Sequence, residues 1–171
     1  MNPTRHIDPM DTIVVPLFLL LSTKLLGGAG LLFGWAKPVP VNWARLRNPK
    51  KDILWVALAG PASNLIMGVL WAITLRSQVS MGFDLHDFWA RMAIAGVQVN
   101  LVLMALNLVP LPPLDGGRIV YSLLPQSYAD KYARIEPYGM LILIVLMFTG
   151  VLWVILQPFL TFGQMIIRLF L

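Results

Sequence analysis

One short stretch contains the residues of this chain that are best suited to form a functional site. It runs from Pro110 to Gly117 as PLPPLDGG. Three prolines in four positions cannot stay in a regular helix, so the chain must unwind and then present the carboxylate of Asp115 beside two conformationally free glycines. A carboxylate near membrane depth needs a cation, a proton or a metal ion as its partner. The plainer alternative is that Asp115 lies in an interfacial turn and pairs with Arg118.

Three asparagines lie in the apolar segments that precede this stretch. Asn64 follows Gly60 and precedes Gly68 at intervals of four, so the three share one helical face. Asn100 and Asn107 lie near one face of the next apolar segment. Small residues at such spacing let helix backbones approach closely, and an asparagine among them can hydrogen-bond across the contact. Helix packing and a direct role in a site are both open interpretations.

The elements that position these residues must be membrane helices, because the composition is strongly apolar. Of 171 residues, 58% are hydrophobic and 12% charged, and the mean hydropathy is +0.75, whereas soluble domains carry about 25% charged residues. The chain has no cysteine, which excludes disulfides and cysteine-ligated metals. The net charge of +5 is concentrated in a loop between apolar segments, which is typical of membrane proteins and argues against a nucleic-acid partner.

Four apolar regions are predicted, at about 12–36, 53–75, 92–114 and 137–167. The last three are long enough to cross a bilayer, since about 20 residues suffice. Lys24 and several glycines interrupt the first, which is therefore either one tilted span or a re-entrant hairpin. We expect an all-α membrane protein: a single domain over 1–171, forming a bundle of about four transmembrane segments, the third broken by prolines.

Lysine and arginine are concentrated in the loops 34–52 and 114–136. Because such loops favour the cytoplasm, we expect a multi-pass protein of the plasma membrane with Asp115 towards the cytoplasmic side.

The motifs NLVP at 107–110 and LDGG at 114–117, preceded by GPASN at 60–64, resemble the site-2 protease family of intramembrane zinc metalloproteases. The segment FGWAKPVPVN at 33–42 is similar to the compact prokaryotic-type branch of that family. The resemblance covers almost the whole chain.

The resemblance implies a zinc ion, Zn2+, as cofactor and a transmembrane helix of another protein as substrate partner within the lipid bilayer. Members hold zinc with two histidines of an HExxH helix and a distant aspartate, and the glutamate activates the metal-bound water. Asp115 matches the third metal ligand. Asn64 and Asn107 match positions near the active centre, where their amides could hold an unwound substrate backbone. The residues that match the surrounding motif are Gly60, Pro61, Pro110, Gly116 and Gly117.

This sequence departs from the family because it contains no HExxH. Its histidines are His6 and His86. If the region 92–114 spans the membrane, His86 is about 30 Å from Asp115, so we expect a solvated loop residue. His6 with one aspartate is too small a ligand set for a catalytic zinc. No catalytic residue is assigned within this chain.

The leading hypothesis is therefore the C-terminal body of a site-2-type metalloprotease whose zinc-binding first helix is missing, through truncation, a misassigned start or genuine loss. Such a chain is expected to be inactive alone. The alternative is a non-catalytic pseudoprotease or membrane scaffold that binds transmembrane helices without cutting them. A third interpretation is a small transporter or ion pathway, since broken helices with buried polar residues also suit ion sites.

Overall fold

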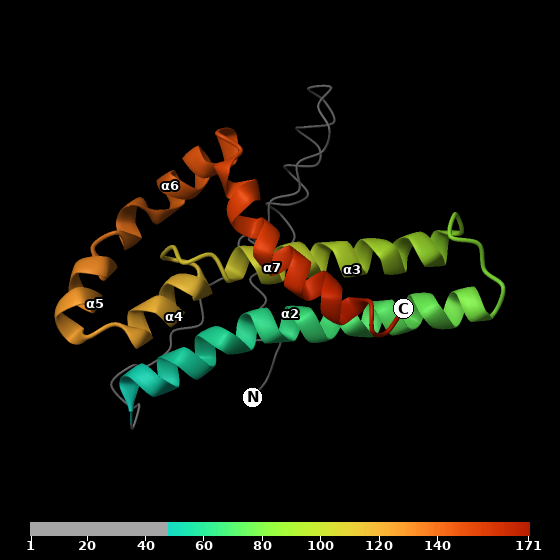
Figure 1. The fold of residues 1–171 in the computed structure, drawn as a ribbon, viewed down its shortest axis with the longest axis horizontal. Coiled ribbons are helices and arrows are strands. Elements are labelled where there is room, and N and C mark those ends of the chain that lie inside the picture. The colour runs from blue at the N-terminus through green and yellow to red at the C-terminus, as the bar shows by residue number, and fades with distance from the viewer. Residues whose placement is uncertain (1–47) are drawn as a thin grey trace, which may run out of the picture. The chain divides into compact units, whose positions relative to one another are not determined.

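The computed structural model describes residues 48–171, and this part of the chain is helical throughout, without a strand (Figure 1). The chain divides into two units, and the described residues all belong to the second, Ala44–Leu171. The region 12–36, the loop 33–42 and His6 lie outside the described residues, and the single domain over 1–171 stays a prediction. The helices are α2 (Pro49–Ser80), α3 (Phe88–Asn107), α4 (Asp115–Leu123), α5 (Gln126–Ala133), α6 (Glu136–Phe148) and α7 (Val151–Ile167).

The two longest helices, α2 and α3, lie side by side and antiparallel (Figure 1). Both are long and apolar enough to cross a membrane. The predicted apolar region 53–75 lies inside α2, which continues through Pro61. The region 92–114 is helical only as far as Asn107, so the helix ends before Pro110, as the prolines predict.

Small residues line the contact between α2 and α3. A Cβ built on Gly68 would lie 3.7 Å from the Cβ of Asn100, and one built on Gly96 would lie 2.5 Å from the indole of Trp71. Ala72 is fully buried. The side-chain amide of Asn100 donates to the carbonyl oxygen of Gly96 in its own helix at 2.8 Å. The small residues therefore bring the two backbones together, and Asn100 satisfies its donor without bridging the helices.

Helix α7 packs onto this pair through a third glycine. A Cβ on Gly163 would lie 2.5 Å from the side chain of Leu101 and 2.8 Å from that of Met104. The buried cluster is formed by α2, α3, α7 and the start of the loop that follows α3. Its members are Ala72, Leu101, Met104, Ala105, Val109, Leu156, Leu160 and Ile167.

The predicted apolar region 137–167 is not one straight helix. It forms α6 and α7, which meet at 91°. Gly150 lies between them with φ +75°, a left-handed conformation that glycine adopts readily and that ends α6. The apolar composition on both sides is uniform, so hydropathy alone does not reveal this break.

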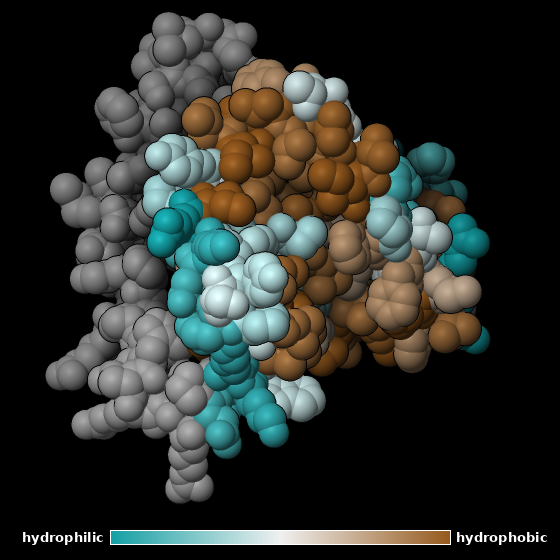
Figure 2. Space-filling model, turned by 60° about the vertical axis from the view of Figure 1, so that its left-hand side comes forward, coloured by the Kyte–Doolittle hydropathy of each residue, from teal (hydrophilic) through white to brown (hydrophobic). Residues whose placement is uncertain are grey.

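Large apolar side chains remain exposed over much of the surface (Figure 2). Phe148 is 82% exposed and Trp55 71% exposed. Such a surface suits lipid, in which exposed hydrocarbon carries no penalty.

The close contact at Gly96 predicts a packing defect when a side chain is added there. Gly96→Val places carbon against the indole of Trp71 and should lower the free energy of unfolding by about 1–3 kcal/mol. Thermal unfolding of the chain in detergent measures the effect. Ala95→Val is the matched control, because Ala95 is exposed on the same helix. Equal melting temperatures for the two variants would contradict this packing.

Candidate functional site

The proline-rich segment between α3 and α4 is a closely hydrogen-bonded turn. The amide of Leu111 donates to the carbonyl oxygen of Val109 at 2.7 Å, and the amide of Leu114 donates to that of Leu111 at 2.9 Å. Val109 is only 2% exposed. The non-helical backbone is thus folded against protein, the condition under which it is tolerated at membrane depth.

Gly116 and Gly117 are needed here because they lack a side chain. A Cβ on Gly116 would lie 2.5 Å from the carbonyl of Leu108, and one on Gly117 would lie 2.7 Å from the carbonyl carbon of Leu111. Both glycines are buried within the first turn of α4, and neither has a positive φ. The expected reason, conformational freedom, is therefore wrong: these glycines let the start of α4 pack against the backbone of the turn.

Helices α5 and α6 contact the same proline-rich turn through one hydrogen bond and one close packing contact. The hydroxyl of Tyr132 donates to the carbonyl oxygen of Pro110 at 3.0 Å. Burial raises the pKa of Tyr132, so the phenol stays protonated and able to donate. Gly139 of α6 packs against the carbonyl of Pro112, and a Cβ there would lie 2.9 Å from the ring of Pro113.

Asp115 is the first residue of α4, and its carboxylate packs directly against Gly60 of α2. A Cβ on Gly60 would contact the carboxylate oxygen Oδ2 and lie 3.4 Å from Cγ. This contact joins the GPASN and LDGG motifs, which are far apart in the sequence. Pro61 is buried beside it, and the hydroxyl of Ser63 donates to the carbonyl oxygen of Gly60 at 2.7 Å.

Asn64 lies one helical turn beyond Gly60 on the same face of α2, about 6 Å along the axis. It is half-buried. Within residues 48–171 its side-chain amide forms no hydrogen bond, so it does not act there as a bridge between helices. Its donor and acceptor groups are available on the face that carries Asp115.

The register of the α2–α3 pair places Asn107 level with the Gly60–Pro61 step. Gly68 lies opposite Asn100, and the two helices are antiparallel. Moving seven residues back along α2 therefore corresponds to moving seven residues forward along α3, to Asn107. Asn107 is the last residue of α3 and is half-buried. The structure therefore brings Asn64, Asn107 and Asp115 to one end of the helix pair.

Asp115 is half-buried, and burial raises the pKa of its carboxyl group. Arg118, one turn later on α4, opposes this shift with its positive charge, but burial has the larger effect. Helix α4 is not one of the spanning helices. The start of a helix favours a negative charge, which supports the ionised carboxylate. The charge of Arg118 and the packing against α2 thus both act on Asp115, and both interpretations of this residue stay predictions.

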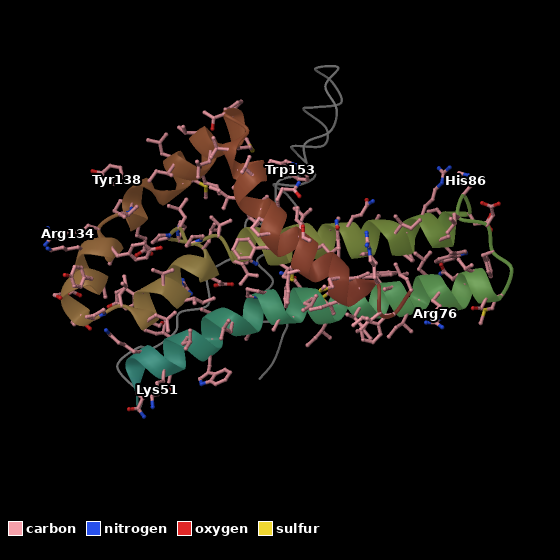
Figure 3. The ribbon with its side chains drawn as sticks, in the orientation of Figure 1. Lys51, Arg76, His86, Arg134, Tyr138 and Trp153 are labelled. Atoms are coloured by element: carbon pink, nitrogen blue, oxygen red, sulfur yellow. The ribbon has the colours of Figure 1, made fainter. Side chains whose placement is uncertain are left out.

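The described residues do not complete a catalytic zinc site. A catalytic zinc takes about three protein ligands and keeps one position open. No group of three histidine, cysteine, aspartate or glutamate side chains occurs among residues 48–171. Asp115 is the residue that the sequence predicts as one ligand. His86 is exposed in the turn between α2 and α3, at the opposite end of α3 from Asp115, which confirms the expected loop histidine (Figure 3).

Three supporting residues were not identified from the sequence. Besides Tyr132 and Gly139, these include Lys50, whose ammonium donates to the carbonyl oxygen of Leu124 at 2.6 Å and ties the start of α2 to the end of α4. All three act across long separations in the sequence. No local periodicity or motif marks such residues.

Tyr132 offers a direct test of the brace on the turn. Tyr132→Phe removes the hydrogen bond to Pro110 and should lower the free energy of unfolding by about 1 kcal/mol. Tyr128→Phe is the control, since Tyr128 is exposed on the same helix and its hydroxyl has no hydrogen bond within residues 48–171. Thermal unfolding in detergent distinguishes them, and an unchanged melting temperature for Tyr132→Phe would refute the brace.

Comparison with known proteins identifies a family that includes the LDGG segment. Residues 77–150 match the family described as Peptidase family M50. No solved structure matches the chain.

Three relatives are zinc metalloproteases by name. "Putative zinc metalloprotease YwhC" of Bacillus subtilis is 34% identical over 182 aligned positions, which cover 99% of this chain and 74% of the relative. "Putative zinc metalloprotease Rip2" of Mycolicibacterium smegmatis is 32% identical, covering 89% of this chain and 54% of the relative. "Zinc metalloprotease MJ0392" of Methanocaldococcus jannaschii is 34% identical over 47% of this chain and 22% of its own length. The chain belongs to peptidase family M50, the site-2 protease family, and its apolar helices are those of an integral membrane protein.

Proposed function

We propose that this chain forms the body of an intramembrane zinc metalloprotease and contributes Asp115 as one metal ligand. The observation that carries the proposal is the packing of the Asp115 carboxylate against Gly60, at the end of the helix pair where Asn64 and Asn107 lie. This carboxylate lies at the start of a helix and contacts the backbone of α2, with no charged side chain of α2 against it. It is therefore well placed to bind a cation.

The two asparagines bind the substrate backbone in this proposal. A transmembrane helix must unwind before a protease reaches its peptide bonds, and the backbone groups it frees need new hydrogen bonds in the absence of water. Asn64 and Asn107 each offer an amide donor and a carbonyl acceptor. Their position beside Asp115 would hold an extended segment next to the metal. A bound zinc ion supplies an activated water and polarises the scissile carbonyl.

The remaining zinc ligands come, in this proposal, from an HExxH helix that the 171 residues do not contain. A single aspartate does not hold a catalytic zinc, so the chain alone should not hydrolyse peptides. The body described above would then act as the platform for that helix.

The orientation proposed is multi-pass, in the plasma membrane, with the Asp115 end towards the cytoplasm. Lys51 and Arg134 lie at the same end of the unit as α4 and α5, and both are exposed (Figure 3). Such basic residues favour the cytoplasmic side. The bundle would have about four spans, with α2 and α3 as two of them and the bent α6–α7 pair as another.

A fusion tests the platform. A membrane helix carrying HExxH, followed by the complete 171-residue chain, should bind about one zinc ion and cleave a transmembrane substrate, whereas the chain alone should do neither. In the fusion, Asp115→Ala should reduce cleavage at least about 100-fold, because loss of a ligand exceeds the effect of losing a supporting contact.

Asp130→Ala is the control for a nearby acid, since Asp130 is exposed on α5. It should leave both zinc content and cleavage unchanged. Zinc-dependent cleavage by the 171-residue chain itself would refute the proposal, as would an active fusion that tolerates the loss of Asp115.

A further inference from the structure

A pocket lies at the other end of the α2–α3 pair, away from Asp115. Its volume is about 340 Å³. It forms between the end of α2, the turn before α3 and the C-terminal residue, and its lining residues are Leu75, Arg76, Val79, Ser80, Leu85 and Leu171. The proposed protease function makes no use of this pocket.

Arg76 has the only charged side chain that lines the pocket, and Leu171 brings the C-terminal carboxylate to its rim. Within residues 48–171 its guanidinium forms neither a hydrogen bond nor an ion pair. The hydroxyl of Ser80 donates to the carbonyl oxygen of Arg76 at 2.8 Å, so this hydroxyl is already committed. The guanidinium therefore supplies the free donors of the pocket, and its planar geometry matches a phosphate group.

The acids nearest in the sequence are already engaged in the turn that carries Leu85. The carboxylate of Asp84 accepts the amide of His86 at 2.8 Å, and the carboxylate of Asp87 accepts the amide of Asp84 at 2.8 Å. No acidic side chain lines the pocket, and the C-terminal carboxylate of Leu171 forms no ion pair with Arg76. A ligand there meets the unpaired positive charge of the guanidinium.

The other lining side chains, Ser80 apart, are apolar, and several of them are exposed. Val79 is 48% exposed, Leu85 53% and Leu171 52%. Arg76 follows directly on the charge-free run that ends at Leu75, which is where a spanning helix reaches the lipid headgroups. A charged donor at headgroup depth beside exposed hydrocarbon is complementary to a lipid with a charged head and an apolar tail.

We propose that this pocket binds one anionic phospholipid of the phosphatidylglycerol type. Its phosphate lies on the guanidinium of Arg76, and an acyl chain lies over Val79, Leu85 and Leu171. The lipid belongs to the leaflet opposite the Asp115 end. The binding is independent of proteolysis, so it stands whether or not the chain is part of an active enzyme.

Native mass spectrometry of the detergent-solubilised chain tests this site by titration with phosphatidylglycerol and with phosphatidylcholine of the same acyl chains. The wild-type chain should retain one phosphatidylglycerol in preference to phosphatidylcholine. Arg76→Gln should weaken phosphatidylglycerol binding about tenfold, as expected for loss of hydrogen bonds to a charged group. It should leave phosphatidylcholine binding unchanged.

Two further variants separate charge from shape. Arg91→Gln removes an exposed charge at the same end of the molecule that does not line the pocket, and should have no effect. Leu85→Ser changes the apolar wall within the turn and should weaken both lipids alike. Should Arg76→Gln fail to fold, Arg76→Lys keeps the charge without the planar donors and should bind with intermediate affinity.

Equal losses for Arg76→Gln and Arg91→Gln would overturn the site, because binding would then follow overall charge. Equal retention of the two lipids by the wild-type chain would also overturn it. Displacement of the lipid by inorganic phosphate at equal concentration would assign the pocket to a free anion instead, and would likewise refute the lipid.

Discussion

The contact between the carboxylate of Asp115 and the bare backbone of Gly60 constrains the whole of the described unit. Any side chain at position 60 would enter the space of the carboxylate oxygen. The start of α4 must therefore lie directly on α2, although α3 and two connections separate them in the sequence. That is feasible only if the chain reverses sharply after α3. The proline-rich turn provides this reversal, and Tyr132 and Gly139 hold the turn from outside.

Glycine serves two different purposes in this chain. At Gly60, Gly96, Gly116 and Gly117 the absence of a side chain allows an atom of a neighbouring segment to approach closely. At Gly150 the positive φ ends α6 and permits the 91° bend to α7. In a lipid-exposed bundle the first use is important, because helices gain little from excluding hydrocarbon and depend on close backbone packing.

The sequence predicts the features that local chemistry determines. Charge-free runs identify α2 and α3, the prolines place the end of α3, and the interval of four from Gly60 to Gly68 identifies the face that meets α3. The break at Gly150, the bond from Lys50 to Leu124 and the support from Tyr132 depend on distances between remote segments. The residues next to Tyr132 or Gly150 in the sequence do not distinguish it from the other tyrosines or glycines, so these long-range features are not predicted. The family resemblance supplied what periodicity could not: the expectation that Asn64 of the GPASN segment and Asp115 belong to one site.

The length of α2 relates the two ends of the unit to the bilayer. Lys51 and Arg76 are separated by about 38 Å of helix, close to the full thickness of a bilayer with its headgroups. Both charges can therefore reach headgroups, in opposite leaflets. Gly60 lies about 14 Å along the helix from Lys51, so the proposed orientation puts the Asp115 carboxylate packed against it below the headgroups on that side. A carboxylate at this level requires a protein surface that excludes lipid and offers a cation, and in the proposed site the turn, the two asparagines and the start of α4 contribute to that surface.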